Sequence, residues 1–189
     1  MKHLTVLMLF TVSLLLIACE EDTSGYESNT PLTDQTLLQE DYEGKSFLED
    51  DIGVVTLSRC VDGDTARFSE DDGETDFSVR FLGIDTPEIG RNKEPWGEAA
   101  SEFTCNRLSN AFTIVLERDP ASSDRETYGR YLAFVWVDGR LLNLELIEES
   151  YTHAVGVLSY KYGEVMQNAW YNAMEKNLKI HGEDDPDYS

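Results

Sequence analysis

Residues 53–84 contain three short segments with the composition of β-strands, separated by turn residues. The first, GVVTLSRCVDG, is rich in β-branched residues and ends in a turn at DGD. The stretch that follows, TARFSEDDGETDFSVRFLGI, contains two further strand-like segments joined by an acidic loop with a glycine. Short β-branched runs bounded by such turns are typical of a strand followed by a β-hairpin.

The rest of the chain adds two strands and three helices to this pattern. Residues 94–111 form the first predicted helix, in which Ala99, Phe103, Leu108 and the nearby Phe112 recur at roughly helical spacing. Strands are predicted over residues 112–119 and 128–140, the latter ending in the hairpin turn DG, and amphipathic helices over residues 141–150 and 162–177. The inner face of the last helix should carry Val165, Ala169, Ala173 and Met174. Five short strands with an interrupting helix fit an α+β fold, a five-stranded OB-fold Greek-key barrel with three helices.

The ends of the chain differ in composition from this domain. Residues 1–18 have a lysine followed by a long apolar run, and Cys19 follows in LIAC, the spacing of a bacterial lipobox. We expect residues 1–18 to be a lipoprotein signal peptide and Cys19 to carry the lipid; an ordinary signal peptide or an uncleaved anchor is the alternative. Residues 19–48 are predicted to be an acidic flexible tether, residues 49–182 the single folded domain and residues 183–189 a disordered acidic tail.

Two cysteines remain once Cys19 is assigned to the lipid. In an exported domain, Cys60 and Cys105 are expected to form one disulfide, because such compartments are oxidising. The alternative is a pair of separate buried thiols. A zinc site is not expected, since the chain has no CxxC motif and no cluster of histidines.

Acidic residues gather at the ends of neighbouring predicted strands. Asp64, Asp85 and Glu88 would repel one another there unless a cation neutralised them. Oxygen ligands favour a hard ion, calcium or magnesium, and the carbonyl of Thr86 could complete the set. The alternative is that these acids only cap turns, which is the role expected for Asp62.

Two arginines within the predicted barrel strands indicate an anionic ligand. Arg80 lies five residues before Asp85, and Arg130 opens a later strand after TYG. Burying a guanidinium group inside a barrel costs free energy unless the group binds an anion, and its planar array of N–H donors suits phosphate oxygens. For each arginine, the alternative is a role on the surface or in a salt bridge. Only His153 and His181 remain outside the leader, and neither has a triad motif, so a Ser-His-Asp hydrolase is not expected. The acids and arginines are instead the parts required for phosphodiester cleavage by an activated water.

Four motifs together resemble the staphylococcal nuclease (thermonuclease) family. They are VDGDTARF, VRFLGIDTPE, GEAASEFT and YGRYLAFVWVDG, which occur in family order between about residues 50 and 181. The resemblance implies an OB-fold barrel with three helices. It also implies calcium-dependent hydrolysis of DNA and RNA that leaves 3′-phosphate ends.

The resemblance assigns roles to individual residues. It places Ca²⁺ ligands at Asp64, Asp85 and the carbonyl oxygen of Thr86. Glu88 matches the glutamate described as the general base for the attacking water. The remaining matches are Arg80 and Arg130, which grip the scissile phosphate and stabilise transition-state charge, and Tyr128, which hydrogen-bonds a terminal phosphate of the bound nucleotide.

The sequence departs from the family pattern outside this catalytic set. Thr127 stands where the family has a lysine, and His181 stands where it has a tryptophan. The family's base-stacking tyrosine aligns with Gly156 or Val157, and a shifted loop could bring Tyr160 or Tyr162 to that place instead. These departures put nucleotide affinity and base preference in question.

The combined expectation is a monomeric, lipid-anchored nuclease of the cell envelope with an extracytoplasmic domain, DNA and RNA as substrates and no protein partner evident. The main rival is a noncatalytic nuclease-like binding or adaptor module in the cell envelope, and a third possibility is a phosphodiesterase that acts on another polyanion. Residues 49–182 contain 13 Lys and Arg against 25 Asp and Glu, a net charge of −12. A domain of this sign is not expected to bind DNA through a broad basic surface.

Overall fold

The computed structural model describes residues 30–70 and 73–188. Its strands are β1 Ile52–Cys60, β2 Thr65–Glu70, β3 Thr75–Phe81, β4 Ile84–Asp85, β5 Ile114–Glu117, β6 Tyr131–Val137, β7 Arg140–Leu141 and β8 His153–Ala154. Its α-helices are α1 Leu32–Gln35, α2 Phe47–Asp50, α3 Gly97–Ser109, α4 Leu142–Glu148 and α5 Gly163–Lys176, with 3₁₀ turns at Gly90–Asn92, Val157–Ser159 and Lys179–His181. In the described part of the chain, no helix is long and apolar enough to cross a membrane.

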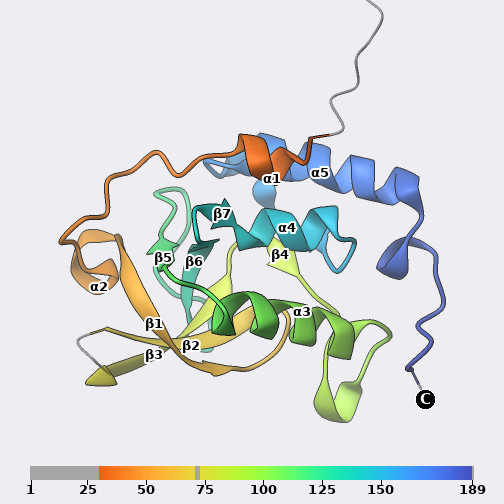
Figure 1. The fold of residues 1–189 in the computed structure, drawn as a ribbon, viewed down its shortest axis with the longest axis horizontal. Helices are drawn as coiled ribbons and strands as arrows, with labels where there is room; N and C mark the ends of the chain where they lie inside the picture. The colour runs from red at the N-terminus through yellow and green to blue at the C-terminus, as the bar shows by residue number, and fades with distance from the viewer. Residues whose placement is uncertain (1–29, 71–72, 189) are drawn as a thin grey trace, which may run out of the picture.

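The main sheet curls into a closed barrel. Its strand order is β3-β2-β1-β5-β6-β7, with antiparallel neighbours, and β3 then pairs with β6 in parallel. This last pairing joins the two ends of the curled sheet, so strands β1, β2, β3, β5 and β6 form a five-stranded mixed barrel (Figure 1). The predicted OB-fold barrel is confirmed, and α3, α4 and α5 are the three predicted helices.

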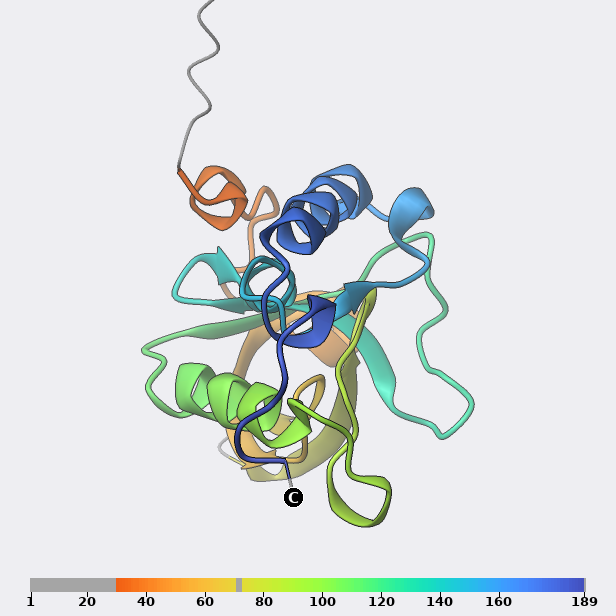
Figure 2. The same cartoon turned by 90° about the vertical axis from the view of Figure 1, so that its right-hand side faces the viewer.

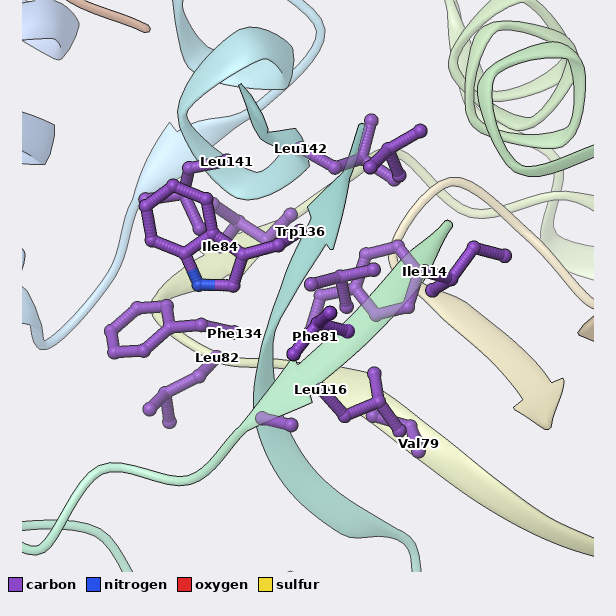
Figure 3. Close-up of a cluster of buried hydrophobic side chains, with 14 of the residues drawn as sticks. Val79, Phe81, Leu82, Ile84, Ile114, Leu116, Phe134, Trp136, Leu141 and Leu142 are labelled. Carbon is purple, nitrogen blue, oxygen red and sulfur yellow. The ribbon is translucent and has the colours of Figure 1, made fainter. Parts of the chain in front are cut away.

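The core fills the barrel and continues under α4 and α5. Strands β5 and β6 are almost wholly buried because the barrel interior lies on one side and the helices cover the other. Figure 3 shows part of this cluster, with apolar side chains from these strands meeting those of β3 and α4. The ten labelled residues are Val79, Phe81, Leu82, Ile84, Ile114, Leu116, Phe134, Trp136, Leu141 and Leu142.

The folded domain begins earlier than the sequence predicted. The residues described from 30 onward pack on the barrel and its helices, whereas we expected a flexible tether up to residue 48. Phe47 is fully buried against the rings of Phe77 and Tyr131, and Glu148 of α4 accepts hydrogen bonds from the first N–H groups of α1. The sequence analysis missed this packing because isolated apolar residues in an acidic segment carry no periodic signal. Cys19 and the predicted leader lie outside the described residues.

The disulfide expected from the sequence is present and joins β1 to α3. Cys60 and Cys105 are bonded, with 45 residues of sequence separation. Thr104, the residue before Cys105 in α3, is buried, and its hydroxyl donates a hydrogen bond of 2.6 Å to the carbonyl of Gly63 in the turn that precedes β2. The helix is therefore attached to the end of β1 by a covalent bond and to the following turn by a buried hydrogen bond.

Removing this disulfide should destabilise the domain strongly. In the chain-entropy account, a crosslink across a 45-residue separation stabilises the folded state by about 4 kcal/mol, because it restricts the unfolded chain. Urea unfolding of the double variant Cys60→Ser/Cys105→Ser should show a comparable loss of unfolding free energy, and reductant should lower wild-type stability to the same value. An unchanged unfolding midpoint in both samples would contradict the predicted contribution.

Candidate active site

The site residues lie at one end of the barrel, where β2, β3, β4 and β6 meet. Thr65 at the start of β2 pairs with Arg80 near the end of β3. The parallel pairing of β3 with β6 places Arg80 opposite Leu132, two residues after Arg130. Barrel closure thus brings together two arginines that are fifty residues apart in sequence.

Arg80 bridges two of the predicted calcium ligands. Its Nη1 lies 2.8 Å from Oδ1 of Asp64, and its Nη2 donates to Oδ1 of Asp85 and, at 3.2 Å, to the carbonyl of Ile84. Two carboxylates share this one guanidinium, so the trio of side chains has a net charge of −1. Asp85 has a largely exposed side chain, which leaves it accessible from solvent.

Asp64 is a buried carboxylate held by a dense set of donors. It is 1% exposed, and its Oδ2 accepts from the backbone N–H of Thr86 at 2.7 Å and from the Thr86 hydroxyl at 3.1 Å. Burial raises the pKa of this carboxyl to about 7, while Arg80 and the Thr86 N–H oppose that rise. The surrounding protein therefore compensates the negative charge only in part.

A glycine permits this close approach between the two loops. A Cβ atom added at Gly63 would lie 2.6 Å from the Oγ1 atom of Thr86 and 2.9 Å from its Cβ. Any other residue at position 63 would displace Thr86, which both hydrogen-bonds Asp64 and carries the carbonyl predicted as a ligand. The glycine in VDGDT is therefore required by the close approach of Thr86.

Arg130 is oriented by partners on two different segments. Its Nε lies 3.0 Å from Oε1 of Glu126, and its Nη1 donates to the hydroxyl of Thr65 at 3.0 Å. Since Thr65 also donates to Oδ1 of Asp64 at 3.1 Å, a chain of polar contacts runs from Arg130 through Thr65 to Asp64 and on to Arg80. Two fixed guanidinium groups beside a partly compensated carboxylate can hold a phosphate group.

Glu88 lies on the loop between β4 and α3 with an exposed side chain. Its backbone is fixed by Glu94, which accepts from the Glu88 N–H at 3.0 Å through Oε2 and donates its own N–H to the Glu88 carbonyl at 2.9 Å. The predicted set does not gather completely: among residues 30–70 and 73–188, no three His, Cys, Asp or Glu side chains cluster closely enough to hold a metal. Asp64, Asp85 and Glu88 therefore do not form one metal-binding cluster, and Glu88 stays a predicted general base outside the predicted ligand set.

The donor set nevertheless fits a hard divalent cation. Asp64 and Asp85 share one counter-charge, and the raised pKa of Asp64 indicates that more positive charge would stabilise its ionised form. Carboxylate and carbonyl oxygens are the ligands that calcium prefers. Asp64, Asp85 and the Thr86 carbonyl are the residues that would hold the ion.

The aromatic residues near the site are placed differently from one another. Tyr128 is 86% exposed on the loop before β6, with the guanidinium of Arg130 5.9 Å from its ring centroid, so its ring is open to solvent beside Arg130. Tyr162 cannot stack on a base, because it is buried in the core and its hydroxyl donates to Glu117 at 3.0 Å. Tyr160 packs edge-on against Phe134. The shifted-loop replacement considered for Tyr162 is therefore wrong.

Sequence reasoning missed four residues that hold the predicted ones in place. The structure adds Thr65, Glu94, Thr104 and Glu126 to the site. Only Glu126 left a sequence signal, since the stretch DRETYGR places an acid four residues before Arg130. The contacts of Thr65 and Thr104 join segments far apart in the chain and leave no local pattern.

Comparisons with known proteins cover the part of the chain that carries most of these residues. The family model described as Staphylococcal nuclease homologue matches residues 78–181, which include Arg80, Asp85, Glu88 and Arg130. The chain is 35% identical over 144 residues to a thermonuclease of Staphylococcus intermedius, covering 74% of this chain and 78% of the relative.

Two relatives from Bacillus subtilis (strain 168) share part of their length with this chain. SPbeta prophage-derived endonuclease YokF is 34% identical over 192 residues, covering 90% of this chain and 63% of the relative. Endonuclease YncB is 40% identical over 98 residues, covering 50% of this chain and 44% of the relative. The chain thus spans less than two thirds of each Bacillus relative. It belongs to the staphylococcal nuclease family of nuclease-type hydrolases.

Proposed function

We propose that the chain hydrolyses phosphodiester bonds of DNA and RNA in a calcium-dependent reaction that leaves 3′-phosphate ends. The observation that carries the proposal is the polar chain from Arg130 through Thr65 and Asp64 to Arg80. It sets two guanidinium groups and two candidate metal ligands at one end of the barrel. The names of the relatives, thermonuclease and endonuclease, support the same chemistry.

The two arginines bind and orient the scissile phosphate. Each planar guanidinium donates paired hydrogen bonds to phosphate oxygens, and such bonds strengthen as negative charge builds in the transition state. Glu126 and Thr65 fix the plane of the Arg130 group before substrate arrives. A calcium ion at Asp64, Asp85 and the Thr86 carbonyl would supply positive charge that stabilises the negatively charged phosphate.

Glu88 accepts the proton of the attacking water. Its carboxylate is exposed, so a water molecule can reach it, and its loop lies directly after the candidate ligands Asp85 and Thr86. As the water oxygen bonds to phosphorus, the bond from phosphorus to the 5′-oxygen breaks. The phosphate stays on the 3′-oxygen of one fragment, and the departing 5′-oxygen takes up a proton to give a 5′-hydroxyl on the other.

The ends of the products test this reaction directly. Digestion fragments should accept phosphate from polynucleotide kinase at their 5′ ends without prior phosphatase treatment. A polymerase should extend their 3′ ends only after phosphatase has removed the 3′-phosphate. Fragments with 5′-phosphate and 3′-hydroxyl ends would overturn the proposed bond cleavage, and an absence of any cleavage would favour the noncatalytic module.

The charge of the chain predicts an unusual response to salt. The full sequence has a formal net charge of −22, so long-range forces repel the substrate, and Arg80 and Arg130 act only at short range. Screening should weaken that repulsion, since the Debye length falls to about 8 Å at 0.15 M salt. Cleavage at subsaturating DNA and fixed free calcium should therefore hold or rise between low and moderate salt. A steep monotonic fall would show instead that basic contacts dominate binding.

The proposal also places the enzyme at a membrane surface. The apolar leader and the LIAC sequence support lipid attachment at Cys19, which would anchor a monomeric domain outside the cytoplasm in the cell envelope. Cys19 precedes the first described residue by eleven positions, a short connection between lipid and domain. Labelling of cells with a fatty-acid analogue should mark the wild type and not a Cys19→Ala variant; equal labelling would refute the assignment.

A further inference from the structure

The C-terminal residues 183–188 were expected to be disordered, but they pack against the start of α3. The backbone N–H of Trp96 donates to Oδ2 of Asp185 at 2.6 Å, and its indole Nε1 donates to the carbonyl of Glu183 at 3.1 Å. Farther along, the hydroxyl of Tyr188 donates to the carbonyl of Lys93 at 3.2 Å. Figures 1 and 2 both show the dark blue C-terminal segment passing beside the start of green α3.

The residues that contact this C-terminal segment also form the end of the loop that carries Glu88. A Cβ atom added at Gly97, next to Trp96, would lie 2.4 Å from the carbonyl oxygen of Glu88, so the two backbones touch. Glu94, two residues before Trp96, hydrogen-bonds both the N–H and the carbonyl of Glu88. The far end of the Glu88 loop and the C-terminal segment thus meet at residues 93–97.

Trp96 needs an external restraint to hold this junction. Its φ of +68° is uncommon for a bulky residue and costs free energy. No side chain within α3 caps its first turn. Asp185 fills that role, since its carboxylate accepts from the N-cap N–H and lies at the positive end of a 13-residue helix.

We propose that Asp185 is a positioning residue for Glu88 and that residues 183–188 fasten the loop from which Glu88 acts. Among residues 30–70 and 73–188, the exposed Glu88 side chain has no hydrogen-bond partner, so its place is set by the backbone of the loop. Asp185 holds Trp96, Trp96 leads into Gly97, and Gly97 packs on the Glu88 carbonyl. This inference rests on the proposed role of Glu88 as general base.

A double-mutant cycle tests whether Asp185 acts through Glu88. Asp185→Ala should lower kcat about tenfold, because a loosened base spends less time in productive geometry. KM and the calcium concentration for half-maximal rate should not change, since Arg80 and Arg130 lie on other segments and Thr86 is held separately by its hydrogen bonds to Asp64. Asp185→Asn keeps an acceptor for the Trp96 N–H and should restore most of the rate. Asp184→Ala, which removes a neighbouring charge without a hydrogen bond, should behave as wild type.

The Glu88→Gln background separates positioning from general stability. If Asp185 acts through Glu88, adding Asp185→Ala to Glu88→Gln should cause no further loss of kcat. Full additivity of the two losses would overturn the proposal. If Glu88→Gln alone kept wild-type activity, the proposed role of Glu88 as general base would be wrong. The role of Asp185 would then be decided by a measurement that does not depend on catalysis.

Limited trypsin digestion provides that measurement. Arg91 and Lys93 lie in the Glu88 loop, and cleavage after them requires the loop to open. Asp185→Ala should speed cleavage at these two positions, while Asp184→Ala and Asp185→Asn should cleave as slowly as wild type. Equal cleavage rates in Asp185→Ala and wild type would show that the C-terminal segment does not restrain the loop.

Discussion

Arg130→Ala is expected to lower kcat for DNA cleavage by about 10²–10³, the usual cost of removing one preorganised donor to transition-state charge. The loss should fall on kcat, because in the proposed mechanism Arg130 binds the phosphate most strongly in the transition state. Arg130→Lys should recover little of the rate. A lysine keeps the charge but cannot donate to Glu126, Thr65 and the phosphate in one plane.

The matched control is Arg67→Ala on the same barrel. Arg67 forms an exposed ion pair with Asp76, N···O 2.6 Å, in the hairpin of β2 and β3, and surface pairs of this kind contribute little. Steady-state kinetics with saturating DNA, together with thermal unfolding of each variant, compare the two losses. If Arg130→Ala cleaved DNA as fast as Arg67→Ala, Arg130 would have no catalytic role.

The second large effect is expected from Glu88→Gln. Glutamine has the shape of glutamate but cannot take up the proton of the attacking water, and loss of a general base commonly costs about 10²–10⁴ in rate. The fold should be unaffected, because the Glu88 side chain is exposed and has no hydrogen-bond partner within the described part of the chain.

Glu102→Gln provides the control for this variant. Glu102 is exposed on α3, and its loss removes the same charge at a distance from the predicted catalytic groups. Both proteins should unfold at the same temperature as wild type, so that any difference in kcat reflects chemistry. Similar kcat values for Glu88→Gln and Glu102→Gln would remove Glu88 from the mechanism.

The sequence predicted the barrel and its helices because their signals are local. The β-branched runs, the DG turns and the helical spacing of Ala169 and Ala173 all appear within short windows, and both alanines are buried as expected. Local patterns failed at the edges of elements. Phe112 was placed on the apolar repeat of the first helix, but it lies beyond the end of α3 with a side chain 98% exposed. Met174 is 45% exposed, and Met166 fills the core instead.

The acids and arginines of the site were singled out from the sequence, the family resemblance assigned their roles, and the structure adds the contacts that orient them. Thr65 meets Arg130 across 65 residues of sequence, and Asp64 meets Thr86 across 22. No composition or spacing rule reveals such pairs, since they exist only once the barrel has folded. The placement of Asp185 beside Trp96 is similar, because an acidic tail reads as disordered until its partner is known.

Cleavage measured against free calcium, for the wild type and for Asp85→Asn, tests the central claim most directly. Asp85 suits the test because its side chain is 62% exposed, so the substitution should not disturb the core. We predict that a chelator abolishes wild-type cleavage and that calcium restores it with a half-maximal concentration of about 10⁻⁴–10⁻³ M. Asp85→Asn should require more calcium and bind it more weakly in calorimetry. Full wild-type cleavage in chelator, or identical calcium curves for the two proteins, would contradict the account.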